Sequence, residues 1–127
     1  MSFETIRFIH SRLAQTAWLY MVIVGVWSAG YYLRNKKLDG QFFGIIAVGE
    51  LLMAAQALFG LTMLVAWKIQ PGKPVHFLYG VLSLLVFPGM YYYTQDDDSR
   101  RSALIWALAG LFMFGVSLRA ISTGPLG

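Results

Sequence analysis

The sequence contains no cysteine, few charged residues and only two histidines. Without cysteine the chain has no ligand for an iron–sulfur cluster, no thiolate for haem iron, no disulfide and no attachment point for a c-type haem. Charged residues make up 13% of the chain, about half of the roughly 25% that is typical of soluble domains. The basic residues flank apolar segments, so contact with lipid headgroups explains them better than binding of nucleic acid.

What the chain has in abundance is apolar residues, at 57% of the sequence. They form four continuous runs, at 13–33, 42–67, 75–93 and 103–118, and crossing a bilayer takes about 20 apolar residues in a helix. The runs do not alternate with polar residues, and lipid tolerates no unpaired backbone groups, so helices are favoured over strands. We therefore predict an all-α integral membrane protein, a single transmembrane domain over 1–127 with helices at 5–33, 42–67, 75–93 and 101–120. Ser2 is the expected N-cap of the first helix.

Short turns between the runs predict an up–down–up–down four-helix bundle with both termini on the same side. The basic residues divide evenly between the two sides: Arg7, Arg12, Lys68, Lys73 and Arg119 on the terminal side, and Arg34, Lys36, Lys37, Arg100 and Arg101 on the other. The positive-inside rule therefore does not choose an orientation. Counting the acidic residues as well favours termini in the cytoplasm, and we expect a bacterial inner membrane.

His10 and His76 each stand at the start of an odd-numbered apolar segment. Odd-numbered helices of such a bundle run in the same direction, so the two imidazoles are expected at the same depth. Small residues follow each histidine at the fourth and seventh positions: Ala14 and Ala17 after the first, Gly80 and Ser83 after the second. This arrangement suits the two axial ligands of one haem b, with the flat macrocycle against the small residues. Two interfacial histidines without a cofactor produce the same pattern, and both interpretations are open.

Four basic residues on the terminal side are candidate partners for haem propionates or for lipid headgroups. They are Arg7, Arg12, Lys73 and Arg119.

Glu50 and Gln56 are polar residues within the second apolar run. Glu50 stands roughly 13 Å along the helix axis from the start of that run, where an unpaired charge costs on the order of 2.5–3.5 kcal/mol. Its candidate roles are a proton relay, a hydrogen bond to a quinone and a tie to a neighbouring subunit. A neutral carboxyl bonded within the bundle is the alternative. Gln56, on another face of the helix, is expected to bond to a neighbouring helix.

Three segments of the chain resemble those of small, uncharacterised four-helix bacterial membrane proteins: His10-Ser11-Arg12, Val75-His76-Phe77-Leu78-Tyr79-Gly80 and Arg119-Ala120-Ile121-Ser122-Thr123-Gly124. More loosely, the helix count and histidine placement are similar to membrane b-type cytochrome subunits. The resemblance to those cytochromes implies electron transport, but it departs from their four-histidine, two-haem pattern, so one bis-histidine haem is the most this chain can hold.

Three functions follow as alternatives. The first is a non-catalytic subunit of a larger respiratory or photosynthetic electron-transfer complex, binding one haem b through His10 and His76. The second is a cofactor-free accessory subunit that packs against other membrane subunits or further copies of itself. The third is a small protein that interacts with a quinone or a lipid through Glu50.

Overall fold

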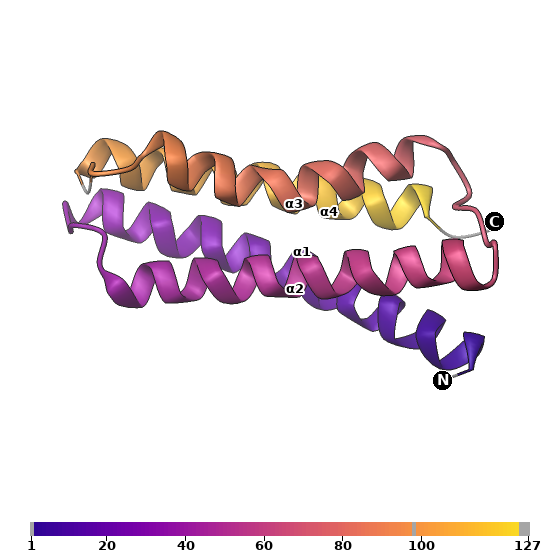
Figure 1. Ribbon diagram of the computed structural model, residues 1–127. Helices are drawn as coiled ribbons and strands as arrows, with labels where there is room; N and C mark the ends of the chain where they lie inside the picture. Colours follow the sequence, from indigo (N-terminus) through magenta and orange to yellow (C-terminus); the bar gives the residue numbers. More distant parts are fainter. Residues whose placement is uncertain (1, 98, 125–127) are drawn as a thin grey trace.

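The computed structural model describes residues 2–97 and 99–124, and these residues form four helices. They are α1 (Phe3–Leu33), α2 (Gly40–Ala66), α3 (Val75–Tyr93) and α4 (Arg100–Thr123). Each is long and apolar enough to cross a membrane, which confirms the predicted all-α class with four candidate spans. The helices lie side by side as an elongated bundle (Figure 1).

Local sequence accounts for where the helices begin. The Ser2 hydroxyl accepts a hydrogen bond from the Thr5 amide, and the Asp39 carboxylate accepts one from the Phe42 amide. Both side chains therefore satisfy a backbone N–H group that has no partner within the helix. The predicted N-cap at Ser2 is confirmed.

Contacts between helix ends show that neighbouring helices run in opposite directions. The ring of Phe3 packs on Trp67, which joins the start of α1 to the end of α2. The Arg100 side chain donates to the Tyr32 carbonyl oxygen, which joins the start of α4 to the end of α1. The start of α1 and the end of α4 consequently lie at the same end of the bundle (Figure 1). We call this the histidine end, and the opposite end, which holds Tyr31, Phe42 and Trp106, the aromatic end.

Each helix packs against its two neighbours in the order α1, α2, α3, α4, while the backbones of the diagonal pairs stay apart within the described residues. The closest approach is between α1 and α4, where a β-carbon on Gly110 would lie 2.6 Å from the backbone nitrogen of Gly25. The absence of side chains at these two positions lets the helices touch, as is usual for small residues in membrane bundles. α3 is the most peripheral helix, with only Phe87 fully buried.

The centre of the bundle is filled unevenly along its length. At the aromatic end Phe42, Phe87 and Trp106 pack edge to face, with ring centroids 5.6–5.9 Å apart, and the Trp106 indole donates to the Thr94 hydroxyl. At the histidine end alanine, glycine and serine residues on all four helices stand among larger apolar side chains around the bundle interior. Dense packing therefore ends partway along the bundle, and space remains beyond it.

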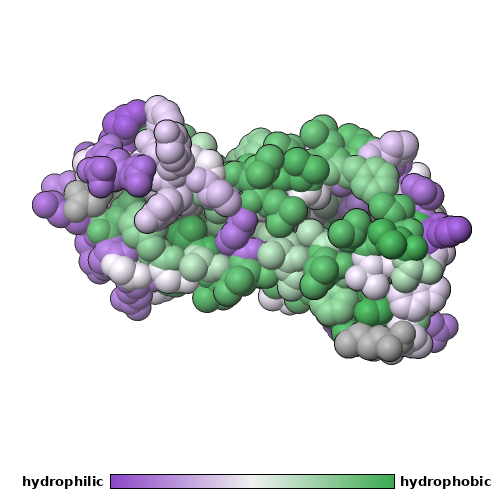
Figure 2. Space-filling model, viewed as in Figure 1, coloured by the Kyte–Doolittle hydropathy of each residue, from purple (hydrophilic) through white to green (hydrophobic). Residues whose placement is uncertain are grey.

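The outer surface is apolar around the middle and polar at both ends (Figure 2). Many large aliphatic side chains on all four helices are exposed, which is what a lipid-facing surface requires and is unfavourable in water. Charged side chains gather beyond this apolar belt, where Arg101 pairs with Asp97 and Lys36 with Asp39. The structure thus supports the assignment to a membrane.

Candidate functional site at the histidine end

A cavity of about 550 Å³ occupies the histidine end, with lining residues from all four helices and the α2–α3 turn. It exists because the diagonal helices stay apart there and no large side chain fills the gap. Its walls are mostly apolar, and the four small residues expected to flank the histidines, Ala14, Ala17, Gly80 and Ser83, all line it. The volume lies within the range of roughly 300–1,000 Å³ that ligand sites occupy.

His10 reaches into this cavity from α1 and is anchored to α2. Its Nδ1 lies 3.0 Å from the backbone carbonyl oxygen of Gln56. A carbonyl oxygen only accepts hydrogen bonds, so Nδ1 carries the proton and Nε2 carries a free lone pair.

His76 enters from α3 and is anchored to α4 in the same manner. Its Nδ1 lies 3.3 Å from the Thr123 hydroxyl oxygen. That hydroxyl donates its only proton to the Arg119 carbonyl oxygen, 2.9 Å away. The Thr123 oxygen is therefore the acceptor toward His76, whose Nδ1 must carry the proton. Both imidazoles consequently have the same tautomer, with Nε2 free.

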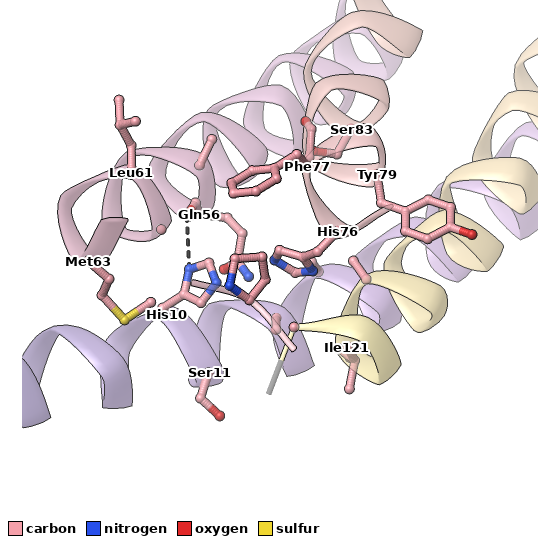
Figure 3. Close-up of a pocket in the computed structure, with 18 of the residues that line it drawn as sticks. His10, Ser11, Gln56, Leu61, Met63, His76, Phe77, Tyr79, Ser83 and Ile121 are labelled. Atoms are coloured by element: carbon pink, nitrogen blue, oxygen red, sulfur yellow. Dashed lines mark hydrogen bonds between the residues drawn. The ribbon is translucent and has the colours of Figure 1, made fainter. Parts of the chain in front are cut away.

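The two imidazoles approach each other across the cavity (Figure 3), with ring centroids 6.5 Å apart and planes inclined at 71°. Two imidazoles on opposite sides of one metal ion have centroids about 6 Å apart, since each metal–nitrogen bond is about 2 Å and the nitrogen lies about 1 Å from its ring centre. Axial imidazoles can rotate about the metal–nitrogen bond, so the inclination is compatible with such a pair. The centroid spacing is therefore compatible with a single metal ion between the rings.

Two glycines make room for these rings. A β-carbon on Gly60 would lie 3.0 Å from Cε1 of His10, and one on Gly124 would lie 2.7 Å from Cε1 of His76. Gly60 stands one helical turn after Gln56, so its missing side chain opens the path from His10 to the Gln56 carbonyl group. Gly124 is held in place by the α2–α3 turn, since the Gly72 amide donates to its carbonyl oxygen.

The cavity also contains polar groups with no partner among the described residues. These are the Gln56 side-chain oxygen and the Ser117 hydroxyl, both buried. Gln56 was expected to bond to another helix through its side chain; it is instead the backbone carbonyl of this residue that contacts α1. Unpaired buried polar atoms cost free energy, and a ligand in the cavity is one way to satisfy them.

Of the four basic residues considered as propionate partners, Arg7 alone lines the cavity. The Arg12 guanidinium lies over the Phe8 ring on the surface. Lys73 and Arg119 are exposed and contribute backbone groups to the structure near Thr123. The structure therefore associates one cation with the site.

Glu50 lies outside the cavity, on the same helix as Gln56. Its Oε1 is buried and has no hydrogen-bond partner in the described part of the chain. Two hydroxyl groups of α1 that could bond to a carboxyl on α2 are engaged elsewhere: Ser28 donates to the Val24 carbonyl oxygen and Tyr31 to the Asp39 carboxylate. Glu50 and the histidine pair are thus separate features.

Sequence reasoning did not single out Gly60 or Thr123 as residues that position the histidines. From sequence, Thr123 and Gly124 fall after the predicted end of the fourth helix at 120 and enter only through the segment that carries the resemblance. No local pattern marks these roles, because each depends on which helix face meets the imidazole of another helix.

Comparisons of this chain with family models, with curated proteins and with solved structures gave no match.

Proposed function

We propose that this chain is a membrane-embedded subunit that binds one haem b between α1 and α3, with His10 and His76 as axial ligands. The observation that carries the proposal is the pair of imidazoles that each contact a neighbouring helix through Nδ1 and whose ring centroids lie 6.5 Å apart. Histidines that ligate metals commonly donate their other N–H to a carbonyl or a similar acceptor, which fixes ring orientation. Both histidines here have that support.

The donor set favours a macrocycle over a bare ion. Within residues 2–97 and 99–124 no three histidine or acidic side chains are grouped to hold a metal. A bare structural or catalytic metal usually takes three or four protein ligands, whereas haem iron needs only two axial ones because the porphyrin supplies the rest. The small residues on the α1 and α3 faces and the apolar walls suit a flat, largely apolar group.

When bound, haem supplies a one-electron redox couple. The residues of this chain then have distinct roles: His10 and His76 complete the coordination, the Gln56 carbonyl and the Thr123 hydroxyl orient them, and the apolar walls exclude water. A haem held by both histidines would keep no coordination position for a substrate, which favours electron transfer over catalysis. We place the protein, as part of the same proposal, in a larger electron-transfer assembly of the bacterial inner membrane with its termini in the cytoplasm.

An absorption spectrum of the protein purified after haem-replete expression tests the proposal. We expect a Soret band with one haem per chain and the sharp bands of low-spin haem on reduction. His10→Ala and His76→Ala should each abolish the low-spin spectrum. Gln15→Ala serves as the control, because this residue lines the same cavity but its side chain bonds to Trp18.

Wild-type protein without a Soret band contradicts the proposal and leaves the cofactor-free accessory subunit as the better interpretation. A low-spin spectrum that survives both histidine substitutions would assign the ligands elsewhere.

A further inference from the structure

We infer that the ligand of the histidine cavity enters sideways from the lipid bilayer, through an opening between α2 and α3. This inference concerns the route by which the cavity of the proposed function is filled, and it rests on that function for the identity of the ligand. The opening itself is a property of the helix packing.

Three apolar residues of the described chain belong to the cavity wall and to the outer surface at once, whereas the exposed residues that α1 contributes to the wall, Arg7, Ser11 and Gln15, are polar. Leu61 of α2 is 55% exposed, and Phe77 and Val81 of α3 are 44% and 51% exposed. A side chain can line the cavity and also be exposed on the outer surface only where the wall is one residue thick or interrupted. All three lie on the two helices that pack against each other least among the four neighbouring pairs. The cavity is therefore open toward the bilayer between these helices.

Gly80 widens this opening from within. A β-carbon at this position would meet nothing within 4 Å, although the residue lines the cavity beside His76. The tightest contact in the bundle, between α1 and α4 at Gly25 and Gly110, lies outside the cavity. The structure consequently offers an apolar lateral path between α2 and α3.

The chemistry along the path indicates which kind of ligand can use it. The residues at the opening are aliphatic or aromatic, whereas the cation Arg7 and the polar residue Gln70 lie among the lining residues near the headgroup level. A planar molecule that partitions into lipid and carries acidic groups on one edge, such as haem, would pass between α2 and α3. It would then place its acidic edge toward Arg7.

The rate of haem uptake tests the route. Apoprotein reconstituted in phosphatidylcholine vesicles is mixed with vesicles that carry haemin, and growth of the Soret band is followed. Leu61→Trp and Val81→Trp narrow the opening from exposed positions, and we expect each to slow uptake about tenfold, within the range of one to three decades seen among variants of one binding site. The final spectrum should not change. Leu58→Trp and Leu78→Trp are matched controls, exposed on the same two helices and absent from the cavity wall.

A second measurement does not depend on haem. Because the chain has no cysteine, a nitroxide label attached to Gly80→Cys is the only label in the protein. We expect its relaxation in vesicles to respond to oxygen, which dissolves in lipid, far more than to a water-soluble nickel chelate. Two results would overturn the inference. One is an uptake rate that is the same in the variants at the opening and in the control variants, and the other is a label whose relaxation responds mainly to the nickel chelate. A missing Soret band together with an oxygen-accessible label would instead reject the proposed haem and retain the opening.

Discussion

Substitution of Gly124 by alanine is expected to weaken haem binding by displacing the His76 imidazole. The new β-carbon would lie 2.7 Å from Cε1 of that ring and 3.1 Å from its Nδ1. Carbon atoms in contact are about 3.5 Å apart, so the ring must move away from α4 by about 0.8 Å. Its hydrogen bond to Thr123, 3.3 Å long here, would then lengthen to about 4 Å, beyond hydrogen-bond distance.

Loss of such a supporting bond typically lowers metal affinity about 10–100-fold. The backbone of Gly124 is helical, with φ −82° and ψ −47°. Because Pro125 follows in the sequence, this region is less favourable for alanine than for glycine, so retention of the fold is measured alongside affinity. Affinity is measured by absorbance titration of the apoprotein with haemin, and helix content by circular dichroism.

Gly115→Ala is the matched control, because it adds the same methyl group to the same helix in open space outside the cavity. We expect its affinity to stay within about twofold of wild type, which is less than 0.5 kcal/mol. Equal affinities for the Gly124 and Gly115 variants would refute the reasoning that contact with Gly124 sets the position of His76.

Two further predictions concern the stability of the bundle. Gly110→Ala places a β-carbon against the backbone of α1, so overpacking should lower the free energy of unfolding by about 1–3 kcal/mol. Gly115→Ala, on the same helix but in open space, should leave the free energy of unfolding unchanged. Equal thermal midpoints of the two variants in detergent would contradict this prediction. The pKa of Asp39 is held below its usual value, mainly by the hydrogen bond from the Phe42 amide. The ionised carboxylate therefore stabilises the fold at pH values above the unfolded-state pKa of about 3.9. This stabilisation is lost as the pH falls through the lower folded-state pKa. Asp39→Asn should therefore reduce the dependence of the thermal midpoint on pH below about 4; an unchanged dependence would contradict the assignment.

The class of fold could be predicted from sequence because it depends on local properties. Continuous apolar runs of about 20 residues specify helices that cross a bilayer, and Ser2 carries its capping role in its own side chain. The end of α4 was less predictable: the helix continues to Thr123, where its backbone bonds to the α2–α3 turn. That contact comes from a distant part of the chain.

The candidate site was predictable only in outline. The positions of His10 and His76 in their segments indicated a common depth, and the small residues beside them indicated space. Which of the four candidate cations borders the cavity was not predictable, because the rotation of each helix about its axis decides it; of the four, only Arg7 lines the cavity.

The sequence by itself determined that the chain forms four apolar helices, and that its two histidines start the first and third of them. These are consequences of composition and of spacing along the chain. Only the tertiary structure decided that the two imidazoles face each other, that each is anchored through Nδ1 to the next helix, and that Gly60 and Gly124 admit them. The physical reason is that these relations depend on how the helices pack, which lets small residues leave a cavity where larger ones would have closed it.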